Sequence, residues 1–173
     1  MGTFTKIART LSLVMLSGGS AAIVFAAIVL VKAATAKGIP VAEAATANAP
    51  LFIAYSRVAL GSAIVLLIAE VIDLVTNKNK AALSKVRYVS SVICAIAAFG
   101  FALGIVPPLE ELLPLIAQDP AAHEKFHKLH EMSRVIFGIS ILGAFTSLLI
   151  PIFGKSEETI ASTKTTAAPV ETA

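Results

Sequence analysis

Residues 50–75 read PLFIAYSRVALGSAIVLLIAEVIDLV, and this stretch decides the fold class. Its only charged side chains are Arg57, Glu70 and Asp73, so nearly the whole stretch is apolar. An α-helix rises about 1.5 Å per residue, and about 20 apolar residues cross a hydrocarbon core about 30 Å thick. The stretch therefore predicts a membrane-spanning helix.

Three further stretches, residues 10–31, 88–106 and 131–153, have similar length and character. Of the 173 residues, 57% are hydrophobic and 14% are charged, whereas soluble domains contain about 25% charged residues. Although Lys6 and Arg9 precede the first stretch, it exceeds the roughly 7–15 residues of a cleavable signal, so we expect a retained helix. We therefore expect an all-α, multi-pass membrane protein with four transmembrane helices in a bundle.

The domain is expected to cover residues 1–153. Residues 154–173 are rich in Thr, Ala, Ser and Glu and lack apolar periodicity, which predicts a disordered cytoplasmic tail. Between the third and fourth stretches, the outer loop is predicted to hold a short interfacial helix that breaks near Pro114. Its apolar residues recur at helical spacing and are Leu109, Leu112, Leu113 and Ile116. Glu110 and Glu111 lie on the opposite side. Asp119 and Pro120 then predict the start of the last helix, with Asp as its cap.

Basic residues outside the four stretches predict the orientation. The amino end, residues 76–87 and the carboxyl tail hold eight Lys and Arg residues, while the other two loops hold four. Cytoplasmic loops carry an excess of Lys and Arg, so both termini are predicted to be cytoplasmic, in an inner or other bacterial-type membrane. The net charge of +3 is spread over loops and helix ends, which argues against nucleic acid as a partner.

Residues 122–134 contain most of the side chains that carry chemistry. His123, His127, His130 and Arg134 are spaced by four, three and four residues, so they share one helical stripe, and Glu131 is close in angle. Histidines at this spacing can chelate zinc or copper. The surrounding Glu and Lys residues are also typical of a helix that stands among headgroups and water. We favour this second interpretation and predict no metal and no cofactor, with the three histidines as weak candidates.

Arg57 lies about 10 Å inside the second stretch, where an unpaired guanidinium is costly. It is predicted to face the bundle interior and to meet Glu131 or Glu110, either in a polar pocket or as a structural ion pair. Glu70 and Asp73 are turned by roughly 160–220° from Arg57 along the same helix. They are expected to pair at the membrane surface with nearby lysines, namely Lys78, Lys80 or Lys85.

Pairs of small residues four apart recur in all four stretches and predict close helix–helix contacts or a dimer. The pairs are Gly18 and Ala22, Ala59 and Ala63, Gly100 and Gly104, and Gly143 and Ser147. The single cysteine, Cys94, excludes a disulfide within the chain. The sequence has no Gly-rich phosphate loop, no Gly-x-Ser-x-Gly, no HExxH and no CxxC, so we expect no enzyme.

The chain resembles the transmembrane-protein-205-like family of four-helix membrane proteins over about residues 10–153. The likeness is carried by Pro50-Leu51-Phe52, by Pro107 and Pro108, and by the run FHKLHEMS at residues 126–133. The resemblance implies four spans and draws attention to His130 and Ser133, but it implies no activity. The family often has Asn four residues after the motif serine, where this chain has Phe137.

Two functions are predicted, neither of them enzymatic. The leading one is an accessory or scaffold component of a membrane assembly, whose partner is the lipid bilayer and a second copy or another membrane protein. The alternative is a small transporter or ligand-binding membrane protein with an outward-facing polar pocket around Arg57 and Arg134. The candidate binding residues for this alternative are Arg57, His127, His130, Glu131, Ser133 and Arg134.

Overall fold

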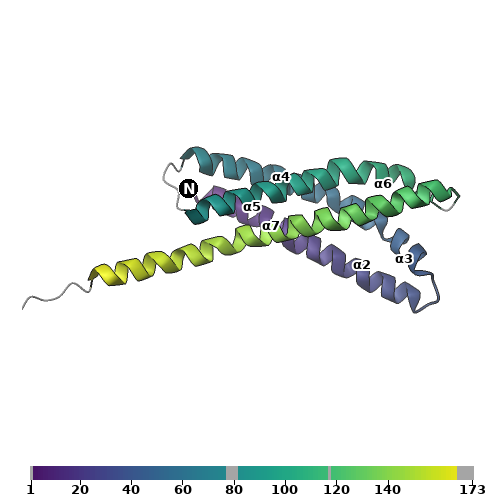
Figure 1. Ribbon diagram of the computed structural model, residues 1–173, viewed down its shortest axis with the longest axis horizontal. Coiled ribbons are helices and arrows are strands. Elements are labelled where there is room, and N and C mark those ends of the chain that lie inside the picture. Colours follow the sequence, from purple (N-terminus) through teal and green to yellow (C-terminus); the bar gives the residue numbers. More distant parts are fainter. Residues whose placement is uncertain (1, 77–81, 117, 167–173) are drawn as a thin grey trace, which may run out of the picture.

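The protein is helical almost throughout, as Figure 1 shows for this computed structural model. The structure describes residues 2–76, 82–116 and 118–166, and no strand occurs in these ranges. In chain order the elements are α1 (Thr3–Val14), the π-helix η1 (Met15–Gly19), α2 (Ser20–Thr35), α3 (Val41–Ala47), α4 (Ala49–Thr76), α5 (Ala82–Phe99), the π-helix η2 (Gly100–Ile105), α6 (Val106–Leu112) and α7 (Pro120–Thr166).

Four helical stretches of the described chain are long and apolar enough to cross a membrane. They are Thr3–Thr35, Glu43–Thr76, Lys85–Leu112 and Pro120–Ile150. The first joins α1, η1 and α2, and the third joins α5, η2 and α6. Together the helices contain all four predicted apolar stretches, so the all-helical class with four such helices is confirmed.

Large apolar side chains cover much of the outer surface. Phe25 and Val75 are each 69% exposed and Leu142 is 68% exposed. The buried positions include four leucines, Leu13, Leu16, Leu66 and Leu109, but also many alanines and serines. Soluble monomers rarely expose large apolar patches, whereas small residues at helix contacts are typical of proteins that pack in lipid. The distribution of side chains therefore fits an apolar environment around the helices.

Helices α5 and α7 approach each other closely at Gly143 of α7. A Cβ atom at this position would lie 3.1 Å from the carbonyl oxygen of Ser90 and 3.2 Å from Cβ of Cys94, both on α5. Ser140 of α7 hydrogen-bonds Cys94 at 3.6 Å. The contact therefore depends on the absence of a side chain at residue 143.

Helix boundaries at the end of the molecule that holds α3 and α6 follow from local capping. Asp119 accepts a hydrogen bond at 2.9 Å from the backbone N–H of Ala121, so the predicted cap of α7 is confirmed. Gly38, with φ of +84°, ends α2, because the N–H groups of Gly38 and Ile39 return to the carbonyls of Thr35 and Ala34.

The predicted short outer helix is α6, in which Leu109 is buried while Glu110 and Glu111 are exposed. It follows η2 without a break, and Pro107 and Pro108 stand in its first turn. At the other end of the chain, the prediction of disorder from residue 154 is wrong as far as Thr166, because α7 continues to that residue. The helix extends through this segment although Ser and Thr, which favour helix less than Ala, Lys or Glu, make up much of it. Residues 167–173 lie outside the described residues.

The two ends of the molecule differ in shape (Figure 1). At one end lie the N-terminus, the end of α4 and the start of α5. At the other end α2 diverges from α7, and α3 returns toward α4. The diverging end is where a cavity forms.

Candidate functional site

A cavity of about 590 Å³ lies between α2 and α7, with α3, α4 and η2 contributing to its walls. We call it the α2–α7 chamber. It is lined by Val24, Ala27, Ile28, Val31, Lys32, Ala45, Asn48, Phe52, Phe101, His130, Ser133, Arg134, Phe137, Gly138 and Ile141. Most of these side chains are apolar, and its volume is in the range of roughly 300–1,000 Å³ that is usual for small-molecule sites.

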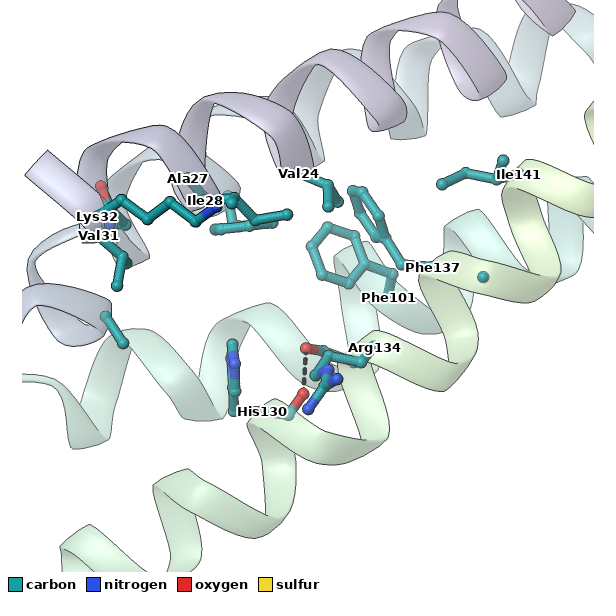
Figure 2. A pocket seen from close by; sticks show the side chains of 15 residues that line it. Val24, Ala27, Ile28, Val31, Lys32, Phe101, His130, Arg134, Phe137 and Ile141 are labelled. Carbon is teal, nitrogen blue, oxygen red and sulfur yellow. Dashed lines mark hydrogen bonds between the residues drawn. The ribbon is translucent and has the colours of Figure 1, made fainter. Parts of the chain in front are cut away.

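Aromatic rings form the inner wall of the chamber. The ring of Phe137 packs edge-to-face against Phe101 at 4.8 Å, Tyr55 at 5.9 Å and Phe52 at 6.0 Å between centroids. Figure 2 shows Phe101 and Phe137 between the two facing helices. Phe137 is 7% exposed, so at the position where the resembled family often has Asn, this chain has an apolar core residue.

The polar residues of the chamber are Lys32, Asn48, His130, Ser133 and Arg134. Ser133 donates its hydroxyl hydrogen to the backbone carbonyl of His130 at 2.6 Å, drawn as a dashed line in Figure 2. Asn48 donates to the carbonyl of Ala44 at 3.0 Å. The serine hydroxyl is thus held by the backbone of its own helix and not by the imidazole, so this pair does not have the geometry of an activated nucleophile.

The polar residues are concentrated toward one end of the chamber. Lys32 is at the last turn of α2, and His130 lies toward the start of α7. Because the two helices run in opposite directions, Val24 and Ile141 lie at the other end (Figure 2). Arg134 and Ile141 are separated by about 10 Å along the helix. The chamber therefore has a basic end and an apolar end.

The predicted site residues on α7 do not all come together. His130, Ser133 and Arg134 line the chamber. His127 and Glu131 are exposed and face each other, with His127 Nδ1 at 3.8 Å from Glu131 Oε1, and neither lines the chamber. His123 is also exposed. Within the described residues, no three His, Cys, Asp or Glu side chains are grouped closely enough to hold a metal ion.

The prediction that Arg57 faces the interior is wrong. Arg57 is exposed and lines a separate groove of about 520 Å³ against α1, together with Phe4, Ile7, Leu11 and Gly61 among others. Arg57 and Arg134 therefore do not share a pocket. Glu131, a predicted partner of Arg57, instead faces His127.

The opposite face of α4 carries a buried ionic cluster, which we define as Glu70, Asp73, Arg87, Tyr88, Ser91 and Ser147. The guanidinium of Arg87 pairs with Glu70 at 3.2 Å and also with Asp73. Glu70 and Asp73 are only 3% and 4% exposed. The prediction that they pair with surface lysines is therefore wrong. Lys85 is exposed, and Lys78 and Lys80 lie outside the described residues.

Hydroxyl groups connect this cluster across three helices. Ser91 of α5 donates to Glu70 of α4 at 2.8 Å, and its oxygen lies 2.7 Å from the hydroxyl oxygen of Ser147 on α7. Tyr88 of α5 donates to Asp73. Arg9 of α1 is also buried, and its charge acts on Tyr88. The cluster thus connects the helices at the end opposite the basic end of the chamber.

The sequence held a signal for this cluster. Glu70 and Asp73 lie three residues apart on α4, and Arg87 and Ser91 lie four apart on α5, so each pair shares a helix face. The prediction of orientation counts Arg9 and Arg87 among the basic residues outside the spans. Both are buried, and without them six basic residues remain in the predicted cytoplasmic segments, against four in the outer loops.

No family model, no curated protein and no solved structure matches this chain. The resemblance to the transmembrane-protein-205-like family is thus untested and stays a prediction.

Proposed function

We propose that this is a multi-pass membrane protein whose helices form a bundle within the bilayer. This proposal is supported by four helices of spanning length, by large apolar side chains on the outside, and by a buried ionic cluster in which Arg87 pairs with Glu70 and Asp73. In hydrocarbon, charged groups are tolerated when they face other helices and pair with one another. Both termini would then lie on the cytoplasmic side.

We further propose that the protein binds, without catalysis, an amphipathic small molecule that reaches the α2–α7 chamber from the bilayer. The observation that carries this proposal is the chamber itself, which is apolar along most of its length and basic at one end. A hydrophobic molecule gains about 25 cal/mol for each Å² of apolar surface removed from water. A ligand that enters from the bilayer has already left the water, so this gain is largely absent. The shape of the chamber and its basic end must therefore supply the selectivity.

Filling the chamber tests this function. A Cβ atom at Gly138 would meet no heavy atom within 4 Å, although the residue lines the chamber. Gly138→Leu should therefore occupy the space without displacing a neighbour, and the protein purified in mild detergent should retain less lipid-like ligand by native mass spectrometry. The matched control is Gly61→Leu, an exposed glycine on α4 that also has open space and lies outside the chamber. Equal retention by both variants would remove the proposed function.

A second candidate function, the accessory or scaffold role, is favoured by Gly100 and Gly104. Both are exposed, and a Cβ atom at either would meet nothing within 4 Å. Within the part of the chain that the structure describes, this small-residue face, in contrast to Gly143, has no close neighbour, and it suits a second helix from outside. A Gly100→Leu, Gly104→Leu double variant should lower the cross-linked dimer or hetero-complex captured in native membranes, whereas Gly61→Leu should not. An unchanged cross-linking pattern would exclude association through this face.

A further inference from the structure

We propose that the α2–α7 chamber selects an anionic amphiphile, with a carboxylate or phosphate head at the basic end and an apolar chain along the aromatic wall. This inference rests on the proposed ligand-binding function and adds the chemical class of the ligand. It is carried by charge complementarity, by the depth of the basic residues and by the arrangement of the aromatic rings.

The charge at the chamber has one sign. Lys32 and Arg134 come from the two facing helices, and no Asp or Glu lines the chamber. The nearest acids along α7 have partners on other faces: Glu131 faces His127 at 3.8 Å, and Glu124 binds Lys128 at 2.7 Å. Among the described residues, neither Lys32 nor Arg134 forms an ion pair. Both are therefore available to an anion.

The depth of these residues matches the head of a lipid-like molecule. Lys32 directly follows the first predicted apolar stretch, and Arg134 lies only three residues inside the fourth. Both basic groups can thus reach the level of the membrane interface, where lysine and arginine extend toward headgroups. From Arg134 to Ile141, and from Lys32 back to Val24, the chamber walls continue inward by about 10–12 Å. An apolar chain attached to the anion would follow the same direction.

His130 gives the basic end a further donor with a fixed orientation. Its ring is half-buried and stacks on Phe126, with a centroid distance of 6.4 Å and an angle of 2° between planes. Neutral imidazole has one N–H group, and this group can add a hydrogen bond to those of a guanidinium. Hydrogen bonds to charged groups are stronger than those between neutral groups, which favours a carboxylate or phosphate over a hydroxyl head.

The test compares three probes that share one alkyl chain: hexadecanoate, hexadecyl phosphate and uncharged hexadecanol. Binding to the full-length protein in a neutral detergent is measured by native mass spectrometry. The wild type should bind at least one of the two anions about tenfold more tightly than the alcohol. The ratio between the two anions distinguishes a carboxylate from a phosphate ligand. A Lys32→Gln, Arg134→Gln double variant should lose this preference, because both residues are exposed and can be replaced without affecting the core.

Arg57→Gln is the matched control, since Arg57 is an exposed arginine outside the chamber and should leave the preference unchanged. Equal affinity of the wild type for anions and alcohol would overturn the anionic class, as would a preference that survives the double variant. If either of these results is found but Gly138→Leu weakens binding of all three probes, the chamber remains a binding site and only the inference about the head group is excluded. If no probe binds, or if Gly138→Leu leaves all binding unchanged, the proposed function itself fails.

Discussion

The guanidinium of Arg87 lies between two buried carboxylates, those of Glu70 and Asp73, and forms an ion pair with each. Removing water from three charges is expensive, and the arrangement is stable only because each charge faces an opposite one. Without the guanidinium between them, the two carboxylates would lose this attraction while they remain buried.

Arg87→Ala should therefore lower the free energy of unfolding by about 3–5 kcal/mol. Lys85→Ala, two residues away on the same helix but exposed, should change it by at most about 0.5 kcal/mol. Thermal unfolding of both variants in the same detergent checks this difference. Similar midpoints for the two variants would mean that the cluster contributes little to stability.

For individual residues, the sequence was most ambiguous about which face of α4 is buried. Its helical geometry correctly placed Arg57 on the face opposite Glu70 and Asp73, but we assigned the wrong face to the interior. Apart from these three charges, apolar residues predominate on both faces of α4, so periodicity cannot tell inside from outside. The deciding information is the partner, Arg87, which comes from another helix and cannot be identified from the spacing along α4.

At the scale of elements, the α5–α7 pair depends on one missing side chain. Gly143→Ala would place a methyl group 3.1 Å from a carbonyl oxygen of the α5 backbone, which cannot move as a flexible side chain would. Overpacking of this kind costs about 1–3 kcal/mol. Gly138→Ala, on the same helix but with open space, should be neutral or stabilising, because alanine favours helix. Unfolding measurements in detergent compare the two; equal effects would show that the helices are not in close contact at residue 143.

The four pairs of small residues illustrate how far an element can be predicted from sequence. Ala59 and Ala63 are buried, and Gly143 and Ser147 contact α5, as expected for helix contacts. The other two pairs are exposed instead, namely Gly18 with Ala22 and Gly100 with Gly104. A spacing of four shows that two residues share a face, but the three-dimensional path of the chain decides which helix, if any, covers that face. The π-helices that interrupt the first and third stretches were not predicted, since their local composition differs little from that of the α-helices around them.

For the whole molecule, length and composition were sufficient for the all-helical class and for four helices of spanning length, because hydrocarbon thickness sets the length of an apolar helix. The chamber was only partly predictable. Its α7 residues were found from the spacing of His130 and Arg134, but the α2 wall, including Lys32, depends on how far α2 diverges from α7. The angle between α2 and α7 depends on tertiary packing, and no local sequence pattern encodes it.

In the proposed membrane arrangement, four crossings would place both termini on one side and the α2–α3 turn on the other. In a background with Cys94→Ala, we expect Lys37→Cys to react with a membrane-impermeant maleimide applied to intact cells. Thr3→Cys and Lys155→Cys should react only after the membrane is permeabilised. Labelling of Thr3→Cys and Lys37→Cys from the same side would contradict the four-helix topology.

The position of Tyr55 has a practical consequence. Its hydroxyl bonds the carbonyl of Met15 in η1, and its ring packs on Phe137, which lines the chamber. The chain has no tryptophan and only one other tyrosine, Tyr88, at the far end in the ionic cluster. Tyrosine fluorescence from a Tyr88→Phe variant therefore originates from Tyr55 alone, which gives the protein a label-free optical reporter of what occupies the space beside it.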